Sequence, residues 1–195
     1  MSNNVAETNG QGAPGMGSGI VVFYEQPILG DLDAALDNNM VSDNSRAGLE
    51  LIHSLVGGSA TVSISSNVAE NSQAQGVHYH ARSNINGNAR LRMHDNTLVG
   101  NGATLIESGA KVSYDDGIGG DLAVDLQRNV ASSNSQDGIS VASDPVTGTA
   151  ALLVFGNALR GNSADGLRVD IAGAGSTTLD AGGGPLVGQG WNSIE

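Results

Sequence analysis

The amino-acid sequence predicts an all-β protein, a right-handed single-stranded parallel β-helix of about six coils. Three observations predict this fold. A polar unit containing Asn and Gly recurs along the chain, apolar residues alternate with period two on both sides of it, and the apolar side chains are nearly all small aliphatics. Of the 195 residues, 29 are Gly and only 3% are aromatic. Such a composition suits a narrow interior filled by many thin, similar layers.

The repeat unit starts at an Asn, passes through a short polar turn with a second Asn, and in four of its five copies reaches a Gly before the next apolar stretch. The first Asn residues of these copies are Asn39, Asn67, Asn96, Asn129 and Asn157, and the second are Asn44, Asn71, Asn101, Asn134 and Asn162. The second Asn advances by 27, 30, 33 and 28 residues. One further coil precedes the copies, between Gly19 and Leu36.

Alternating apolar residues on either side of the Asn pair mark strands that bury one face. The inward pairs upstream of the first Asn are Val62 and Ile64, Leu91 and Met93, Val124 and Leu126, and Leu152 and Val154. The inward pairs downstream of the Gly are Leu49 and Leu51, Val77 and Tyr79, Ile139 and Val141, and Leu167 and Val169. The shared offsets indicate that all copies have one register.

A unit of this size cannot bury its apolar face alone, so the units must stack on one another. Equivalent positions then lie about 4.8 Å apart, and stacked Asn amides can bond both the turn backbone and the Asn above and below. We therefore expect Asn67, Asn96 and Asn129 to form one column. We also expect a flexible leader at residues 1–17, followed by a β-helix domain over residues 18–195.

The recurrent Asn-x4-Asn-Ser-x-x-Gly units, over about residues 18–195, resemble those of the right-handed parallel β-helix repeat proteins of the pectate-lyase-like superfamily. The end of the chain, Asp180 to Ile194, resembles the Gly-rich closing segment of many bacterial β-helix repeat proteins. The resemblance implies the fold. It does not choose an activity, because this scaffold carries lyases, hydrolases, epimerases, adhesins and structural spikes.

The charge balance excludes several partners and chemistries. A net charge of −12, with only eight Lys and Arg, argues against nucleic acid and against an anionic membrane surface, and no segment is suited to membrane insertion. The absence of Cys excludes disulfides and thiolate chemistry. The first 19 residues lack a secretory signal pattern. The protein is then either intracellular or trimmed from a longer secreted chain, and the composition favours the second, an extracellular or cell-surface protein.

The basic side chains gather in one coil, where they predict a binding surface. His78, His80, Arg82, Arg90, Arg92 and His94 fall within 17 consecutive residues. Such a girdle could bind an anionic polysaccharide, with Arg making bidentate contacts to carboxylates. The alternative is that these outward positions are simply polar.

Acidic side chains suggest two further candidates. Asp115, Asp116 and Asp121 lie in a Gly-rich stretch, Ser113–Asp121, which we interpret as the extra residues of the longest coil. It could bind Ca²⁺, although Asp-Asp-Gly is also a plain turn sequence. Asp125, with Arg92 one coil below and His94 beside it, is the one catalytic group that the sequence suggests. A surface salt bridge is the alternative.

These observations favour a non-enzymatic extracellular or surface module, acting as a rigid structural or glycan- or protein-binding element. The alternative is a polysaccharide-active enzyme, a lyase, epimerase or hydrolase on an anionic glycan. A fragment of a trimeric spike is a third hypothesis. Uncapped β-helix ends are unpaired strand edges, so we expect self-association through them or attachment to a larger parent chain.

Overall fold

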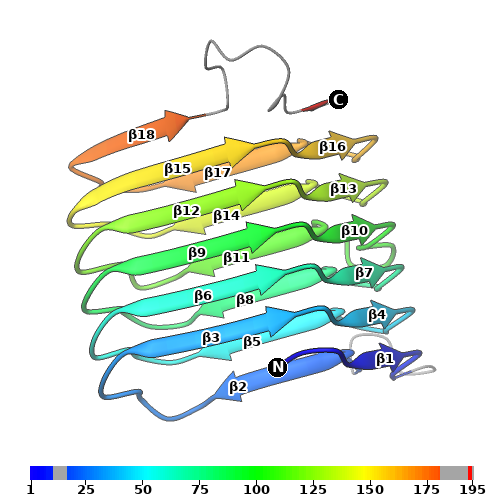
Figure 1. Ribbon diagram of the computed structural model, residues 1–195, viewed down its shortest axis with the longest axis horizontal. Coiled ribbons are helices and arrows are strands. Elements are labelled where there is room, and N and C mark those ends of the chain that lie inside the picture. Colours follow the sequence, from blue (N-terminus) through cyan, green and yellow to red (C-terminus); the bar gives the residue numbers. More distant parts are fainter. Residues whose placement is uncertain (11–16, 181–192, 195) are drawn as a thin grey trace.

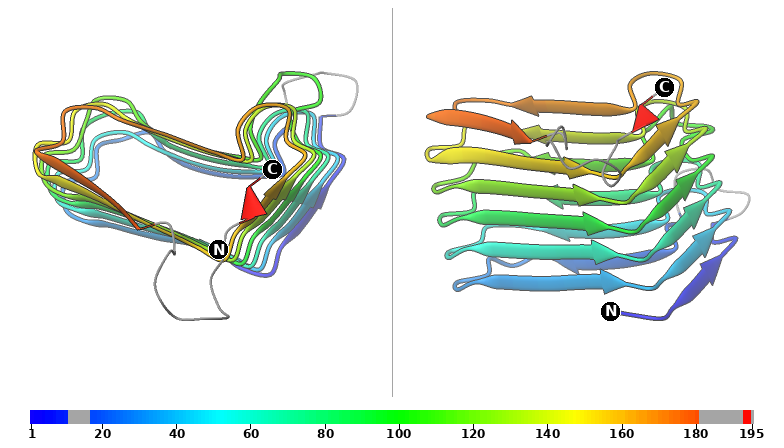
Figure 2. Two further views of the ribbon diagram at one scale, coloured as in Figure 1. Left: turned by 90° about the horizontal axis from the view of Figure 1, so that it is seen from above. Right: turned by 45° about the horizontal axis from the view of Figure 1, so that its top comes forward.

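The computed structural model describes residues 1–10, 17–180 and 193–194, which form one parallel β-solenoid (Figure 1). Every strand pairing in these ranges is parallel, and no helix occurs there, hence none that could span a membrane. Seen from the C-terminal end, the chain runs counter-clockwise as it rises toward the viewer (Figure 2), so the solenoid is right-handed. The predicted fold class is confirmed. The Gly-rich closing segment lies almost entirely outside the described residues.

Each coil contributes one strand to each of three sheets. Sheet A contains β3 (Leu32–Asp37), β6 (Ala60–Ser65), β9 (Ala89–His94), β12 (Leu122–Gln127), β15 (Thr149–Phe155) and β18 (Ser176–Asp180). Sheet B contains β1 (Val5–Glu7), β4 (Met40–Ser42), β7 (Val68–Glu70), β10 (Thr97–Val99), β13 (Val130–Ser132), β16 (Ala158–Arg160) and β19 (Ser193–Ile194). Sheet C contains β2 (Ile20–Tyr24), β5 (Leu49–His53), β8 (Val77–Ala81), β11 (Ala110–Tyr114), β14 (Ile139–Ser143) and β17 (Leu167–Ile171).

Sheets A and C face each other, and sheet B lies at an angle at one end of the coil (Figure 2). The predicted inward pairs fill the space between the sheets: Leu91 and Met93, for example, are fully buried in β9. Val169 is an exception at 38% exposed, because β17 belongs to the last coil of sheet C and no further strand of that sheet covers it in the described part of the chain.

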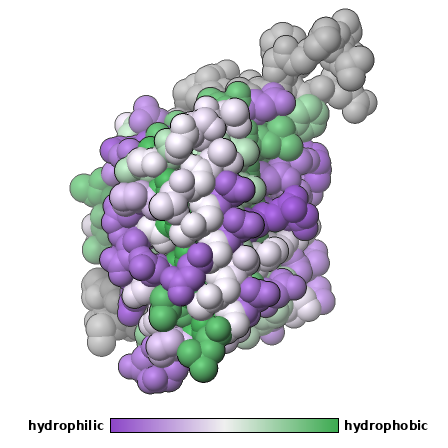
Figure 3. All heavy atoms as spheres, turned by 90° about the vertical axis from the view of Figure 1, so that its left-hand side faces the viewer, coloured by the Kyte–Doolittle hydropathy of each residue, from purple (hydrophilic) through white to green (hydrophobic). Residues whose placement is uncertain are grey.

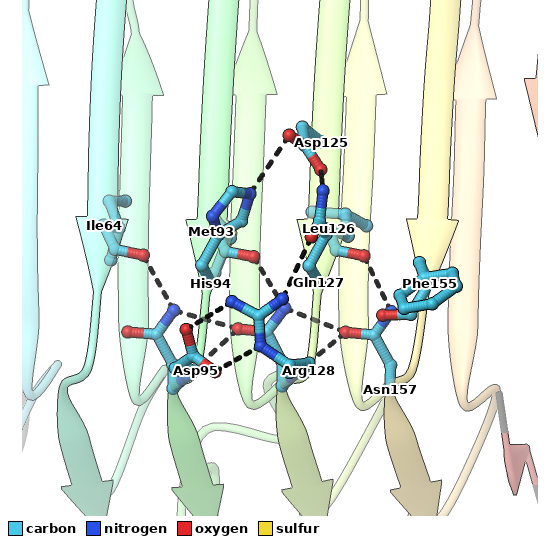
Figure 4. A network of polar contacts seen from close by, with 12 residues as sticks. Ile64, Met93, His94, Asp95, Asp125, Leu126, Gln127, Arg128, Phe155 and Asn157 are labelled. Atoms are coloured by element: carbon cyan, nitrogen blue, oxygen red, sulfur yellow. Dashed lines mark hydrogen bonds and ion pairs between the residues drawn. The ribbon is translucent and has the colours of Figure 1, made fainter. Parts of the chain in front are cut away.

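The predicted Asn column is confirmed (Figure 4). Asn67 Nδ2 donates to Asn96 Oδ1 at 3.0 Å, Asn96 Nδ2 to Asn129 Oδ1 at 2.9 Å, and Asn129 Nδ2 to Asn157 Oδ1 at 2.9 Å. Each acceptor oxygen also takes the backbone N–H of the preceding Asn, and each second amide proton goes to a strand carbonyl, such as Ile64 O at 2.8 Å from Asn96. The buried amides are thus fully paired.

The second column corrects the repeat. Asn44, Asn101, Asn134 and Asn162 stand in it, but the position in the third coil belongs to Ser72, whose N–H donates to Asn101 Oδ1 at 3.0 Å. Asn71 is instead an exposed turn residue with a φ of 53°. The true steps between equivalent positions are 28, 29, 33 and 28 residues, as in the first column.

The glycine of the repeat is required by close packing against this second column. A Cβ on Gly76 would lie 2.7 Å from Asn101 Nδ2 and 2.8 Å from Gly109 O in the next coil. A Cβ on Gly48 or Gly138 would likewise lie 2.6 or 2.5 Å from the carbonyl oxygen of the equivalent glycine in the next coil. Only a residue without a side chain fits between the ladder and the neighbouring backbone.

The extra residues of the longest coil also lie elsewhere than predicted. Ala110 and Leu122 are separated by twelve positions, as are their pairing partners Val77 and Ala89, so the stretch 113–121 contains no insertion. The insertion is the loop 102–108, which follows Asn101 and exposes Leu105 and Ile106.

The range predicted as a leader contains ordered structure. Strand β1 pairs with β4 in sheet B, and Asn4 Nδ2 donates to Asn39 Oδ1 at 2.9 Å. Asn9 Nδ2 donates to Asn44 Oδ1 at 2.9 Å. Both Asn columns therefore extend into residues 1–10, upstream of the boundary that we placed at residue 18.

Candidate functional site

The predicted girdle of basic residues is divided between two opposite surfaces. His78 and His80 project from β8 on the outer face of sheet C, and Arg82 follows that strand. Arg90, Arg92 and His94 project from β9 on the outer face of sheet A. Because the two sheets face each other across the core (Figure 2), their outer faces point in opposite directions. No single ligand-binding surface can include all six side chains.

On the outer face of sheet C the basic side chains already have partners. His78 Nδ1 lies 3.4 Å from Glu50 Oε1, and His80 Nε2 lies 2.5 Å from Asp115 Oδ2. The guanidinium of Arg82 lies over the ring of Phe23, 5.1 Å from its centroid. Each of the three side chains is therefore engaged with another residue of the protein itself.

Glu50 is the unexpected member of this face, since it occupies an outward strand position yet is only 2% exposed. Its burial alone would raise the pKa, but hydrogen bonds with His78 and Ser18 and the charge of Arg46 outweigh burial, so the net pKa is lowered. No local pattern indicates this burial, because Glu50 alternates with apolar residues like any outward residue.

On the outer face of sheet A, Arg90 and Arg92 have no ion-pair partner among the described residues. Arg90 stands in register with Ala123, and Ala123 with Ala151 in the next coil. These small side chains leave a shallow cavity of about 390 Å³ beside Arg90, bordered also by Asp125 and Leu153. The outer face of sheet A therefore offers two guanidinium groups without ion-pair partners next to a shallow cavity lined in part by small side chains.

The predicted catalytic group does come together on the same face. Asp125 is in register with Arg92, as expected, and Gln127 with His94. His94 Nε2 lies 3.1 Å from Asp125 Oδ2, although the two groups are not aligned as a hydrogen bond. Gln127 Nε2 donates to Asp125 Oδ1 at 2.8 Å (Figure 4). Asp125 is thus held by two neighbours.

A second carboxylate near this group is fully engaged. Arg128 donates to both oxygens of Asp95, at 2.7 and 2.8 Å (Figure 4). These bonds, with the charge of Arg128, lower the pKa of Asp95 and raise that of Arg128. Asp95 is therefore not free to act as a second catalytic carboxylate.

The three predicted Ca²⁺ ligands do not converge. Asp115 contacts His80, whereas Asp121 Oδ1 accepts hydrogen bonds from Thr149 N at 2.7 Å and Thr149 Oγ1 at 3.0 Å, which lower its pKa. Asp116 lies exposed at the turn. Over the described ranges, no three His, Asp or Glu side chains come close enough to hold a metal ion.

Asp121 belongs instead to a third polar ladder, in addition to the two Asn columns, that sequence reasoning missed. Its members stand directly before the strands of sheet A, and each side-chain oxygen accepts the backbone N–H of the next: Ser59 N to Asp31 Oδ1 at 2.7 Å, Asn88 N to Ser59 Oγ at 3.1 Å, and Asp121 N to Asn88 Oδ1 at 2.8 Å. The changing residue type hid the column. The turns that carry it lie on the face seen in Figure 3, where hydrophilic and intermediate residues predominate and hydrophobic ones form separate patches.

Comparisons with known proteins assign no relative. No protein-family model matches the chain, and neither the curated proteins nor the solved structures contain a significant match. What the chain does must therefore be argued from its own surfaces.

Proposed function

We propose that the chain is a non-enzymatic β-solenoid module, placed outside the cell or on its surface, that acts as a rigid element and binds an anionic polysaccharide on the outer face of sheet A. The pair Arg90 and Arg92 carries this proposal, because both are without ion-pair partners in the described part of a chain of net charge −12. The repeat and the architecture also support a relationship to the pectate-lyase-like β-helix proteins.

The geometry of this face suits an extended, carboxylate-bearing ligand. Arg90 and Arg92 are alternate residues of β9 and so project from the same side of the strand. A guanidinium binds a carboxylate through two parallel N–H groups. The floor over Ala123 and Ala151 leaves room for a sugar ring next to Arg90. Because the groups stand on paired strands, little ordering of the backbone is needed on binding.

The test compares two double variants of equal charge. Arg90→Ala with Arg92→Ala should reduce binding to alginate, pectate or a glycosaminoglycan at least tenfold, measured by calorimetry after a glycan-array screen. The control, Arg82→Ala with Arg168→Ala, removes two cations on or beside the opposite face and should bind like the parent. Equal loss in both variants, or no binding by the parent chain, would overturn the proposal.

A polysaccharide-cleaving enzyme is the second candidate, because Arg92, His94 and Asp125 are brought to one face. A lyase would release an unsaturated product that absorbs in the ultraviolet, and a hydrolase would shorten the glycan. We expect neither with the parent chain. If the parent chain cleaved a polysaccharide and His94→Ala or Asp125→Ala abolished the cleavage, the enzyme hypothesis would replace that of a binding module.

A further inference from the structure

The N-terminal end of the solenoid exposes a strand edge. Strand β2 is the first strand of sheet C and, in the part of the chain that the structure describes, pairs only with β5 (Figure 1). The neighbouring edge of β3 is partly covered, because Met1 N donates to Ala35 O at 2.7 Å and Asp37 N donates to Met1 O at 3.0 Å. Among the described residues, the open edge at this end is therefore that of β2.

The free backbone groups of β2 can be assigned. Ile20 N donates to Gly48 O at 2.9 Å, and Tyr24 O accepts from Ser54 N at 3.1 Å, so these residues turn their backbone toward β5. Successive residues of a parallel strand direct their backbone groups to opposite neighbours. The N–H and C=O groups of Val21 and Phe23 consequently point to the open side.

A cavity adjoins this edge. It measures about 420 Å³ and is bordered by Val22 and Leu51 of sheet C and by Ala34 and Leu36 of sheet A, with Met1 beside them. Ala34 is the smallest member of an inward column that continues as Val62, Leu91, Val124, Leu152 and Leu179. The open end thus combines unpaired backbone with space for an inward apolar side chain.

The charges around this end select the kind of strand that fits. Residues 1–45 contain six acidic side chains and no Lys or Arg: Glu7, Glu25, Asp31, Asp33, Asp37 and Asp43. Asp33 borders the cavity itself. Two such ends would repel each other, whereas a strand with basic residues at alternate positions would gain both apolar burial and charge complementarity.

We propose that the N-terminal end of the solenoid is a docking site for an extended peptide of another protein, in which apolar residues alternate with Lys or Arg, and which adds to sheet C as a further strand beside β2. Main-chain bonds to Val21 and Phe23 supply affinity, and the cavity takes an apolar side chain of the peptide. This site is separate from the polysaccharide surface on sheet A.

The probe is the fluorescent peptide Lys-Val-Lys-Val-Lys-Val-Lys, measured by fluorescence polarisation. Two control peptides keep its length: one with Glu in place of Lys, and one with the four Lys and three Val in separate blocks, which keeps the charge and loses the alternation. We expect binding of the alternating Lys peptide alone. Equal binding of the block peptide would show unspecific attraction to an acidic protein and overturn the proposal.

Variants of the chain locate the site. Val21→Pro removes an outward N–H without removing a bond to β5, and Pro is tolerated on edge strands, so it should reduce peptide binding at least tenfold. Val21→Lys, which keeps the backbone groups, should weaken binding by charge. Val169→Pro, on the strand at the opposite end of sheet C, should bind normally. Unchanged peptide binding by Val21→Pro and Val21→Lys would exclude this site in favour of another strand edge. Concentration-dependent self-association of the chain without peptide, measured by light scattering, would exclude it in favour of a second copy of the chain.

Discussion

Replacing Ser72 by Asn should repair the interruption that the described residues show in the second Asn column. Ser72 is fully buried, and its hydroxyl has no hydrogen-bond partner among the residues that the structure describes. Below it, Asn44 Nδ2 donates to Ala6 O at 3.3 Å but meets no amide oxygen in the next coil. An Asn at position 72 would offer such an oxygen to Asn44, as Asn134 does to Asn101 at 3.2 Å.

The magnitude follows from the bonds of the intact coils. The new amide would accept from the N–H and Nδ2 of Asn44 and donate to a carbonyl of β4 and to Asn101 Oδ1. Each such bond contributes about 1 kcal/mol net, ordering the longer side chain costs about 1 kcal/mol, and bonds in one network are not additive. We expect the free energy of unfolding to rise by about 2 kcal/mol, which corresponds to about 4–8 °C in Tm for a chain of this size.

The assay is urea denaturation and calorimetry of Ser72→Asn beside two controls. Ser72→Ala removes an unpaired hydroxyl and should change the free energy by less than about 0.5 kcal/mol. Asn71→Gly should be neutral or stabilising, because position 71 has a φ of 53° and equivalent turn positions are Gly100 and Gly161. A Ser72→Asn variant that is no more stable than the parent, or a large loss in Asn71→Gly, would refute the register assigned to this column.

Three further predictions concern the fold. Asn96→Ala leaves two donors of Asn67 and the carbonyl of Ile64 without partners, so the free energy of unfolding should fall by about 3–5 kcal/mol in urea denaturation; a loss below about 1 kcal/mol would contradict the ladder. Deleting residues 103–106 should leave the far-ultraviolet circular dichroism unchanged and change the free energy of unfolding by about 1 kcal/mol at most. Deleting residues 115–118 removes buried Ile118 and should unfold the chain. If the second deletion were tolerated better than the first, the assignment of the insertion to 102–108 would be wrong. Burial lowers the pKa of His53 despite its contact with Ser54 O, so the neutral imidazole is favoured in the folded state. The contribution of His53 to the free energy of unfolding should be complete above the pKa of the unfolded state, about 6.5, and should fall as the pH drops below it. If the parent and His53→Gln showed the same pH dependence of stability, this role of His53 would be excluded.

The fold was predictable because stacking requires each coil to repeat the same pattern. The inward positions of β6, β9 and β12 and the column of Asn67, Asn96 and Asn129 follow directly from that pattern. The errors arose where residue identity replaced spacing. Asn71 matches the repeat by residue type whereas Ser72 matches it by position, and the acidic stretch 113–121 resembles an insertion although the extra residues lie in 102–108.

The candidate site was predictable only within one sheet. The adjacency of Arg92 and Asp125 followed from the coil length, because both stand on the same strand position one coil apart. The opposite orientation of His78 and Arg92 did not, since alternation shows which side chains point outward but not toward which side of the solenoid the strand faces. The burial of Glu50 was not predictable for another reason: the side chains that cover it come from other coils and from a turn.

The opposed outer faces of sheets A and C also shape how such a protein can change. Residues 28–33 positions apart are neighbours, while residues fourteen apart, such as His78 and Arg92, lie on opposite sides. Recognition on one side can therefore diverge while the other side is kept. A patch wider than one strand, however, draws on neighbouring coils, so that its members stand about one repeat apart in the sequence.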